Sequence, residues 1–335
     1  MKKIIALILS LILFLSLANA AGAEETKTAA FVTFGLGGDF FQTLANTFVT
    51  NFEADGWKAQ YADGQFNPTA QIEAAENFIA MNVDVLFIWS VAPEAMSAVI
   101  ADAQQKGIKV IAFVAPTEPY DALMVSDDKE LADNCVKLAA KWINETYPDA
   151  ADGSVPVAVF SCRVAETGVV QADELLRIEE FCPKAKLVEE VECADETMTV
   201  GQTAMENLYI SNPEVKVFLT AHNGLATGIN NYFTAISSPV TDYTGMGIFA
   251  INGDSSSAEV IKSSIEGKAP FRGMVLTGSV NDTANEMLMV ANGLMDSTLP
   301  VGHLQKAGTV FVDASTVDEF LTTGTVVSVT AADYE

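Results

Sequence analysis

The sequence is short of the side chains on which catalysis and metal binding most often depend. Its 335 residues include only two histidines and four cysteines, and no cysteine pair has C-x-x-C spacing. A zinc site is therefore not expected. The motifs G-x-S-x-G, H-E-x-x-H and G-x-x-x-x-G-K-[ST] are also absent, so the commonest hydrolase and nucleotide-binding signatures are missing. We expect no catalytic residues, no metal and no cofactor, and thus a protein that is not an enzyme.

Positive charge is scarce as well. The 18 lysines and arginines face 44 aspartates and glutamates, which gives a formal net charge of −26. Such acidity argues against binding to nucleic acid or to anionic lipid surfaces. Among the three arginines, Arg177 lies in the middle of a predicted helix and Arg272 at the start of a predicted strand. Arg163 follows a strand directly and is a candidate ligand contact, the alternative being a surface ion pair with Glu166.

The four cysteines leave two alternatives open. Cys162 and Cys193 each fall at the predicted carboxyl end of a strand, so a disulfide between them is geometrically possible. An exported protein permits such a bridge. The other alternative is that these two residues, like Cys135 and Cys182, are buried unpaired thiols.

Only one long hydrophobic run is present, and it lies at the start of the chain. Two lysines precede the apolar run Ile4–Leu17, and Ala18-Asn19-Ala20 is a small-x-small cleavage site. These features are typical of an export signal, and the run is short for a retained membrane anchor. We predict that residues 1–23 are a cleaved signal peptide. Removal of its two lysines moves the net charge to −28. With no cysteine near the run for lipid attachment, we expect a periplasmic protein.

The segment from Thr28 to Pro116 alternates apolar strands with helices of 10–15 residues. This alternation predicts a parallel sheet covered on both faces. Ligands of such sheets bind beyond the carboxyl ends of the strands. The predicted strands are Ala29–Phe34, Lys58–Ala62, Val83–Trp89 and Ile108–Val114.

The second half of the chain repeats the same alternation, so we predict two similar doubly wound α/β lobes. No sequence repeat accompanies this repetition of architecture. The residues Thr330–Glu335 are small or polar, and we expect them to be mobile. The predicted strands of the second half are Pro156–Cys162, Ala185–Cys193, Val215–Ala221, Met246–Asn252, Arg272–Gly278 and Thr309–Ala314.

Two motifs in the first half carry a family resemblance. A glycine-rich turn, Gly35–Gly38, is followed by Asp39 and the pair Phe40-Phe41, and Asp63–Gln71 has the pattern Asp-x-x-x-(Asn/Asp)-Pro-x-x-Gln. The chain thereby resembles the sugar-binding (ribose- and galactose-type, type I) periplasmic binding proteins of ABC importers.

The resemblance implies two lobes joined by a three-segment hinge, with the ligand in the cleft between them. We place the crossings near Val125, Leu276–Gly278 and Gly302–Lys306. The N-terminal lobe would then comprise residues 27–125 plus 278–304, and the C-terminal lobe residues 126–277 plus 305–329.

Aromatic residues at strand ends suit a sugar, whose C–H groups pack on aromatic rings while its hydroxyls need polar partners. Phe40 and Phe41 follow the first strand, Trp89 ends the third, and Tyr120 follows the fourth. The alternative for Phe41 and Trp89 is a place in the core. Together with polar residues of both halves, the predicted ligand-binding set is Asp39, Phe40, Phe41, Trp89, Ser90, Tyr120, Arg163, His222, Asn223, Asn252 and Thr277.

The chain departs from the family pattern at two places. Ribose- and galactose-type members typically carry Asp-Arg where this sequence has Ala115-Pro116, and an aspartate where it has Asn252. The charged hydroxyl-binding residues that are usual at these two places are therefore missing, and the ligand need not be a common pentose or hexose.

These observations favour an exported, monomeric solute-binding protein that binds a monosaccharide or related polyol and delivers it to an ABC permease. Two alternatives remain. One is a ligand-sensing module for a membrane receptor, and the other is a secreted hydrolase on a similar sheet.

Overall fold

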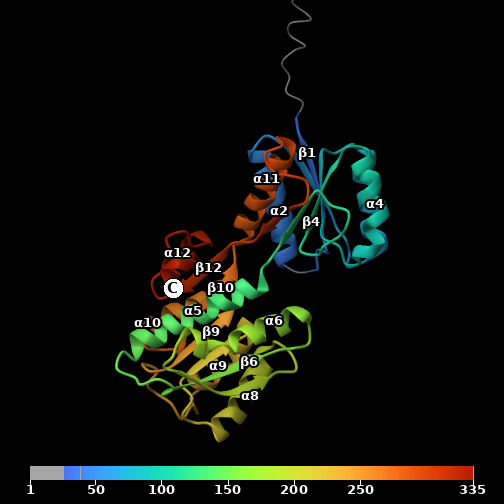
Figure 1. Cartoon of the computed structure of the whole chain (residues 1–335). Coiled ribbons are helices and arrows are strands. Elements are labelled where there is room, and N and C mark those ends of the chain that lie inside the picture. The colour runs from blue at the N-terminus through green and yellow to red at the C-terminus, as the bar shows by residue number, and fades with distance from the viewer. Residues whose placement is uncertain (1–25, 38, 335) are drawn as a thin grey trace, which may run out of the picture. The chain divides into compact units, whose positions relative to one another are not determined.

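The computed structural model describes residues 26–37 and 39–334 (Figure 1). The predicted signal peptide lies outside the described residues. The chain divides into two compact units, the first ending at Asp121 and the second beginning at Ala122. The discontinuous lobes expected from the sequence stay a prediction. Within the described part of the chain, no helix is long and apolar enough to cross a membrane.

The first sheet has six strands in the order β11-β5-β4-β3-β1-β2. Strands β1, β2, β3 and β4 pair in parallel, and β11 pairs in parallel with β5. Helices α2 (Asp39–Ala54), α3 (Pro68–Ala80) and α4 (Pro93–Gln105) connect the strands of the first unit. The strands are β1 (Thr28–Val32), β2 (Lys58–Ala62), β3 (Val85–Ile88), β4 (Lys109–Phe113), β5 (Ala122–Val125) and β11 (His303–Lys306).

Alternation of side chains along β1 and β3 builds a core on each face of this sheet. On one face Phe31 and Phe87 contact Phe48 of α2, with ring centroids 5.5 and 5.4 Å apart. On the other face Ala30 and Leu86 pack in the cluster that contains residues of α3 and α4. Figure 1 accordingly shows α2 and α4 on opposite sides of the strands. Continuous apolar strands are needed here because both faces are covered.

The second sheet has the order β12-β10-β9-β8-β6-β7, in which β12 pairs antiparallel with β10 and the other described pairs are parallel. Its strands are β6 (Val155–Ser161), β7 (Ala185–Glu192), β8 (Val217–Thr220), β9 (Gly247–Ile251), β10 (Phe271–Thr277) and β12 (Thr309–Asp313). The helices that follow Ala122 are α5 (Asp128–Thr146), α6 (Glu166–Leu175), α7 (Ile178–Phe181), α8 (Met198–Ser211), α9 (Asn223–Thr234), α10 (Ser255–Ile265), α11 (Val280–Met295), α12 (Val317–Thr323) and the 3-10 helix Ala331–Tyr334.

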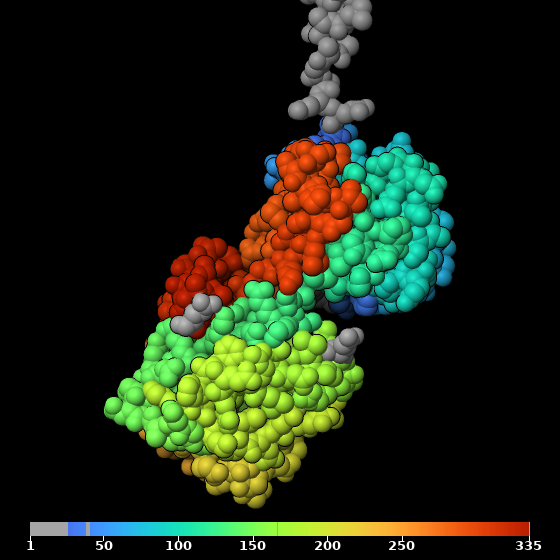
Figure 2. All heavy atoms as spheres, viewed as in Figure 1, coloured from blue at the N-terminus to red at the C-terminus, as the bar shows by residue number. Residues whose placement is uncertain are grey.

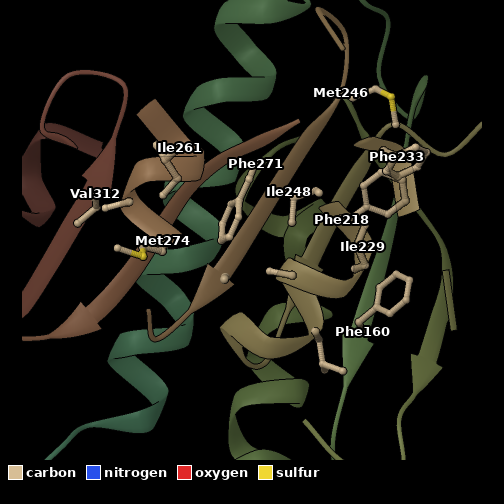
Figure 3. Packing of buried hydrophobic residues seen from close by; sticks show 14 of the residues in the cluster. Phe160, Phe218, Ile229, Phe233, Met246, Ile248, Ile261, Phe271, Met274 and Val312 are labelled. Atoms are coloured by element: carbon tan, nitrogen blue, oxygen red, sulfur yellow. The ribbon is translucent and has the colours of Figure 1, made fainter. Parts of the chain in front are cut away.

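Two apolar clusters cover the faces of the second sheet. One contains residues of α8, α9 and α10, and in Figure 3 Phe218 of β8 lies against Phe233 of α9, with ring centroids 5.5 Å apart. The other contains Leu138 and Ile143 of α5. The predicted fold class is confirmed, since each sheet has six strands with interleaved helices.

The sequence predicted a mobile C-terminal segment, but the structure packs Tyr334 of that segment against the second sheet. Tyr334 is 5% exposed, and its ring stacks on Phe311 with centroids 4.3 Å apart. Its hydroxyl donates a hydrogen bond to Asp313 Oδ2 at 3.0 Å. One large aromatic side chain is thus enough to fix a segment of small residues. Figure 2 shows the neighbouring α12, in dark red, at the surface of the second unit.

The four cysteines are buried and unbridged. Cys162 and Cys193 follow neighbouring strands, because Ser161 of β6 pairs with Glu192 of β7. The structure therefore contains the unpaired thiols that the sequence left as one alternative. Burial raises the pKa of the Cys193 thiol to about 11, which disfavours its reactive thiolate.

Candidate ligand-binding residues

Aromatic rings gather at the carboxyl edge of β1, β3 and β4. Trp89 lies 5.5 Å from Phe34, 5.2 Å from Phe41 and 5.1 Å from Phe113, measured between ring centroids. Phe66 adds a fifth ring, edge-on to Phe34 and Phe41. We call these five residues the aromatic cluster. The sequence predicted two of its members, Phe41 and Trp89, and the structure brings them together.

The Asp63–Gln71 motif holds the loops around this cluster. Asp63 Oδ1 accepts hydrogen bonds from the backbone N–H of Leu36 at 3.1 Å and of Gln65 at 2.9 Å. Asn67 caps α3 by accepting from the N–H of Thr69 at 2.8 Å. The aspartate thus ties the turn after β1 to the loop after β2, and the asparagine begins the next helix.

Gln71 joins the ends of β1 and β3. Its side chain is fully buried. The amide Nε2 donates to the carbonyl oxygens of Thr33 and Trp89 at 2.9 and 2.7 Å, and Oε1 accepts from the N–H of Val91 at 3.0 Å. Trp89 is therefore positioned by a side chain from α3. The polar end of the sequence motif acts on the backbone that carries the candidate ligand contact.

We expect Gln71→Leu to lower the free energy of unfolding by about 2 kcal/mol, because two buried carbonyls and one N–H lose their partner. Urea denaturation would measure the change. The matched control is Gln105→Leu on the exposed side of α4, where surface substitutions usually stay within about 0.5 kcal/mol. Equal effects of the two substitutions would contradict the role of Gln71.

The other predicted residues of the first unit have different surroundings. Ser90 is buried, and its Oγ accepts a hydrogen bond from the N–H of Ala92 at 3.1 Å. Tyr120 precedes Asp121, whose N–H donates to the carbonyl of Val110 at the start of β4. Tyr120 therefore lies at the amino end of β4, because the chain has run back along the strand, and it is not brought together with Trp89. The side chains of Asp39 and Phe40 lie outside what the structure describes.

Polar residues line the carboxyl edge of the second sheet. Its strands β10, β9, β8 and β6 are consecutive neighbours. At their carboxyl ends or within three residues of them lie Thr277, Asn252, the pair His222-Asn223, and Arg163, respectively. The structure thus places all five residues predicted in the second unit along one edge.

Hydrogen bonds position His222 and Asn223, and Asn252 has an unusual backbone conformation. His222 caps α9, since its Nδ1 accepts from the N–H of Gly224 at 3.2 Å. Asn223 Nδ2 donates to Ser257 Oγ at 3.2 Å, and Ser257 in turn is bound by the α10 cap Asp254. Asn252 has a left-handed backbone with φ of 61°, a conformation that asparagine tolerates better than most residues.

Arg163 is held by two carboxylates. Its Nε donates to Glu190 Oε1 and one terminal nitrogen donates to Asp173 Oδ1, each at 2.8 Å. Burial opposes ionisation of Glu190, but hydrogen bonds from Arg163 and Ser161 outweigh it, so the pKa of Glu190 is lowered. The ion pairs found here differ from the Glu166 pair considered from the sequence; the Glu166 side chain is outside the described structure. The guanidinium is oriented at the sheet edge and partly exposed.

Arg272 lies near the start of β10, as predicted, and thus at the opposite edge of the second sheet. Its guanidinium donates to the backbone carbonyls of Met246 at 2.9 Å, of Ser264 at 2.8 Å and of Tyr243. It also lies over the ring of Trp142, 5.9 Å from the centroid. Desolvation lowers the pKa of Arg272. These contacts assign Arg272 to the scaffold.

Comparison with known sequences connects this architecture to one family. The model of the periplasmic binding protein domain matches residues 29–286. The ribose import binding protein RbsB of Bacillus subtilis (strain 168) is 24% identical over 242 residues, which cover 68% of this chain and 76% of that protein. The fructose import binding protein FruE of Bifidobacterium longum (strain NCC 2705) is 27% identical over 166 residues, 46% of this chain and 51% of that protein.

Solved structures share the fold. A periplasmic ribose ABC transporter protein from Conexibacter woesei DSM 14684 superposes with a TM-score of 0.70 at 16% identity, covering 90% of this chain and 97% of that one. AraP, an arabinose binding protein from Geobacillus stearothermophilus, gives a TM-score of 0.68 at 15% identity, covering 88% and 99%. Because the family model spans more than half of the sequence, the chain belongs to the periplasmic binding protein domain family.

Proposed function

We propose that the protein is an exported, monomeric solute-binding protein of an ABC importer. In this proposal it binds a monosaccharide or related polyol between two lobes, residues 27–125 plus 278–304 and residues 126–277 plus 305–329, and delivers it to a membrane permease. The observation that carries the proposal is the contrast between the two sheet edges. The first presents the aromatic cluster, and the second presents Asn223, Asn252, His222 and Arg163.

This contrast suits the two kinds of surface on a sugar. The C–H face of a sugar ring packs on aromatic side chains, while its hydroxyls exchange hydrogen bonds with amide and guanidinium groups. Closure of two lobes around a ligand is a known hinge transition. Exclusion of water on closure would strengthen each hydrogen bond to the ligand.

The names of the relatives support the same class of ligand. Those proteins are described as binding or importing ribose, fructose and arabinose. At Ala115-Pro116 and Asn252 the chain lacks the charged residues that the family resemblance implies for binding hydroxyls. The proposal is therefore a sugar-like solute whose hydroxyls meet amide and guanidinium groups at the polar edge.

A thermal-shift screen tests the proposal. The probes are D-ribose, D-fructose, L-arabinose, D-galactose and their alditols. Nucleosides and small carboxylates are tested separately as alternative classes of ligand. A ligand present at 100 times its Kd stabilises the native state by about 2.7 kcal/mol, so a binding sugar should raise the melting temperature clearly. A rise with nucleosides or carboxylates alone would refute the sugar assignment.

Arg163→Lys should lower the affinity for the bound sugar about tenfold or more, because an ammonium group does not reproduce the planar fork of a guanidinium. Calorimetric titration measures the change, and Arg177→Lys on the surface of the same unit is the control. If Arg163→Lys leaves the affinity as it is, the guanidinium serves only its ion pairs with Glu190 and Asp173.

A further inference from the structure

Phe66 combines an exposed aromatic side chain with a left-handed backbone. Both features cost free energy, and a purely structural role explains neither. Its side chain is 48% exposed although it is a large aromatic group. Its backbone is left-handed, with φ of 52°, and so is that of Gln65, with φ of 53°. For a bulky non-glycine residue such a conformation is a genuine outlier. It persists only when the surrounding structure imposes it, and such residues concentrate at binding sites.

The surrounding hydrogen bonds impose this conformation. The N–H of Phe66 donates to the carbonyl of Phe34 at 3.0 Å, and the N–H of Asn67 donates to the carbonyl of Gly64 at 2.9 Å. Asp63 holds the N–H of Gln65 from the other side. The loop after β2 is thus fixed to the end of β1 on both sides of the exposed ring.

The glycine turn after β1 leaves room for the ring. A Cβ atom at Gly35 would lie 2.5 Å from the Phe66 ring, and one at Gly37 would lie 2.9 Å from it. The ring stands edge-on to Phe34 and Phe41, at interplanar angles of 86° in both pairs. Two glycines, a strained loop and two neighbouring rings therefore keep an aromatic side chain half-exposed at the carboxyl edge of the first sheet.

We propose that Phe66 contacts the ligand and selects cyclic sugars over acyclic polyols. This inference rests on the proposed function and narrows its ligand class. A ring-form sugar offers a rigid C–H face that matches a fixed aromatic wall. An open-chain polyol must lose several freely rotating bonds to present the same face, and this ordering lowers its affinity.

The test compares two substitutions at Phe66 in the full chain. Phe66→Asn removes the ring and keeps a residue that tolerates the left-handed backbone, whereas Phe66→Tyr keeps the ring. Calorimetry measures binding of D-ribose against ribitol, L-arabinose against arabinitol and D-galactose against galactitol. For each sugar that the unsubstituted protein binds, Phe66→Asn should lower the affinity at least tenfold, change the affinity for the alditol less than threefold, and leave the urea midpoint unchanged or higher. Phe66→Tyr should retain the preference for the ring form.

The outcomes separate this inference from the proposed function. If the unsubstituted protein binds a sugar and Phe66→Asn binds it equally well, Phe66 is not a ligand contact and the proposed function stands. If Phe66→Asn weakens sugar and alditol alike, the ring does not select between them. If the unsubstituted protein binds neither these six probes nor any other sugar or alditol of the thermal-shift screen, the proposed function fails and this inference fails with it.

Discussion

Replacing Trp89 with alanine is expected to lower sugar affinity by about 30-fold, the effect of removing an aromatic anchor worth about 2 kcal/mol. Trp89 follows β3 directly, and its backbone carbonyl is held by Gln71. Its indole is half-buried among Phe34, Phe41 and Phe113. It is the one tryptophan at a carboxyl strand end, because Trp57 precedes β2 and Trp142 lies on α5. Ligand binding should therefore change Trp89 emission.

The control is Trp57→Phe, which changes a buried tryptophan beside Phe52, away from the candidate site. It should leave both the affinity and the ligand-dependent change in emission intact. Full loss of a buried tryptophan costs about 3–5 kcal/mol of stability, and Trp89→Ala should cost less because the indole is partly exposed. Should Trp89→Ala destabilise the protein strongly while the folded fraction binds sugar normally, Trp89 belongs to the core.

Arg272→Met should reduce the free energy of unfolding by about 3 kcal/mol or more. Three backbone carbonyls lose a charged donor, and hydrogen bonds to charged groups contribute about 1.5–3 kcal/mol each before non-additivity is considered. The carbonyls of Tyr243 and Met246 lie in the loop before β9, and that of Ser264 lies at the end of α10. Urea denaturation followed by Trp142 emission would report the loss, because the guanidinium lies over that indole.

Arg177→Met is the matched control. Arg177 is a partly exposed arginine that pairs with Glu174 and Glu180 nearby in the chain and with Asp133 of α5 at 3.5 Å, and such solvent-accessible pairs add little to stability. Its substitution should leave the denaturation midpoint nearly unchanged. A loss for Arg272→Met no larger than that for Arg177→Met would show that the three carbonyls find other partners.

Patterning predicted the fold because a parallel sheet covered on both faces leaves a strong signal. Central strands of such a sheet are apolar along their whole length, as in Val85–Ile88, where all four residues are buried. The antiparallel direction of β12 and the pairing of β11 with β5 left no such signal. Both depend on contacts between segments far apart in the chain rather than on local composition.

The candidate site was predictable only where a residue lies within a few positions of the carboxyl end of a strand. That rule located Trp89, Arg163, Asn223 and Asn252. It misplaced Tyr120, since the chain returns to the amino end of β4 before reaching that residue. Phe66 was missed because its exposure depends on a left-handed backbone, which is typical of glycine and asparagine rather than phenylalanine.

Gln71 shows a different limit. The residue was noticed as part of a family motif, yet its role became visible only from its bonds to Thr33, Trp89 and Val91. A buried amide with three backbone partners looks, in a sequence, like any glutamine on a helix. The packing of Tyr334 was likewise not predicted, because its contact with Phe311 is not visible in a segment made mostly of small residues.

The pairing of β5 with β11 also bears on how the chain is made. A ribosome releases Ala122–Val125 long before His303–Lys306, so β5 waits for its outer partner through the synthesis of nearly the whole second sheet. During that interval β5 is an open strand edge, which is a template for pairing with other chains. Closing so long a loop is also slow. Chains truncated before residue 303 should therefore aggregate rather than persist as half-proteins, and holding the chain unfolded until synthesis ends would protect it.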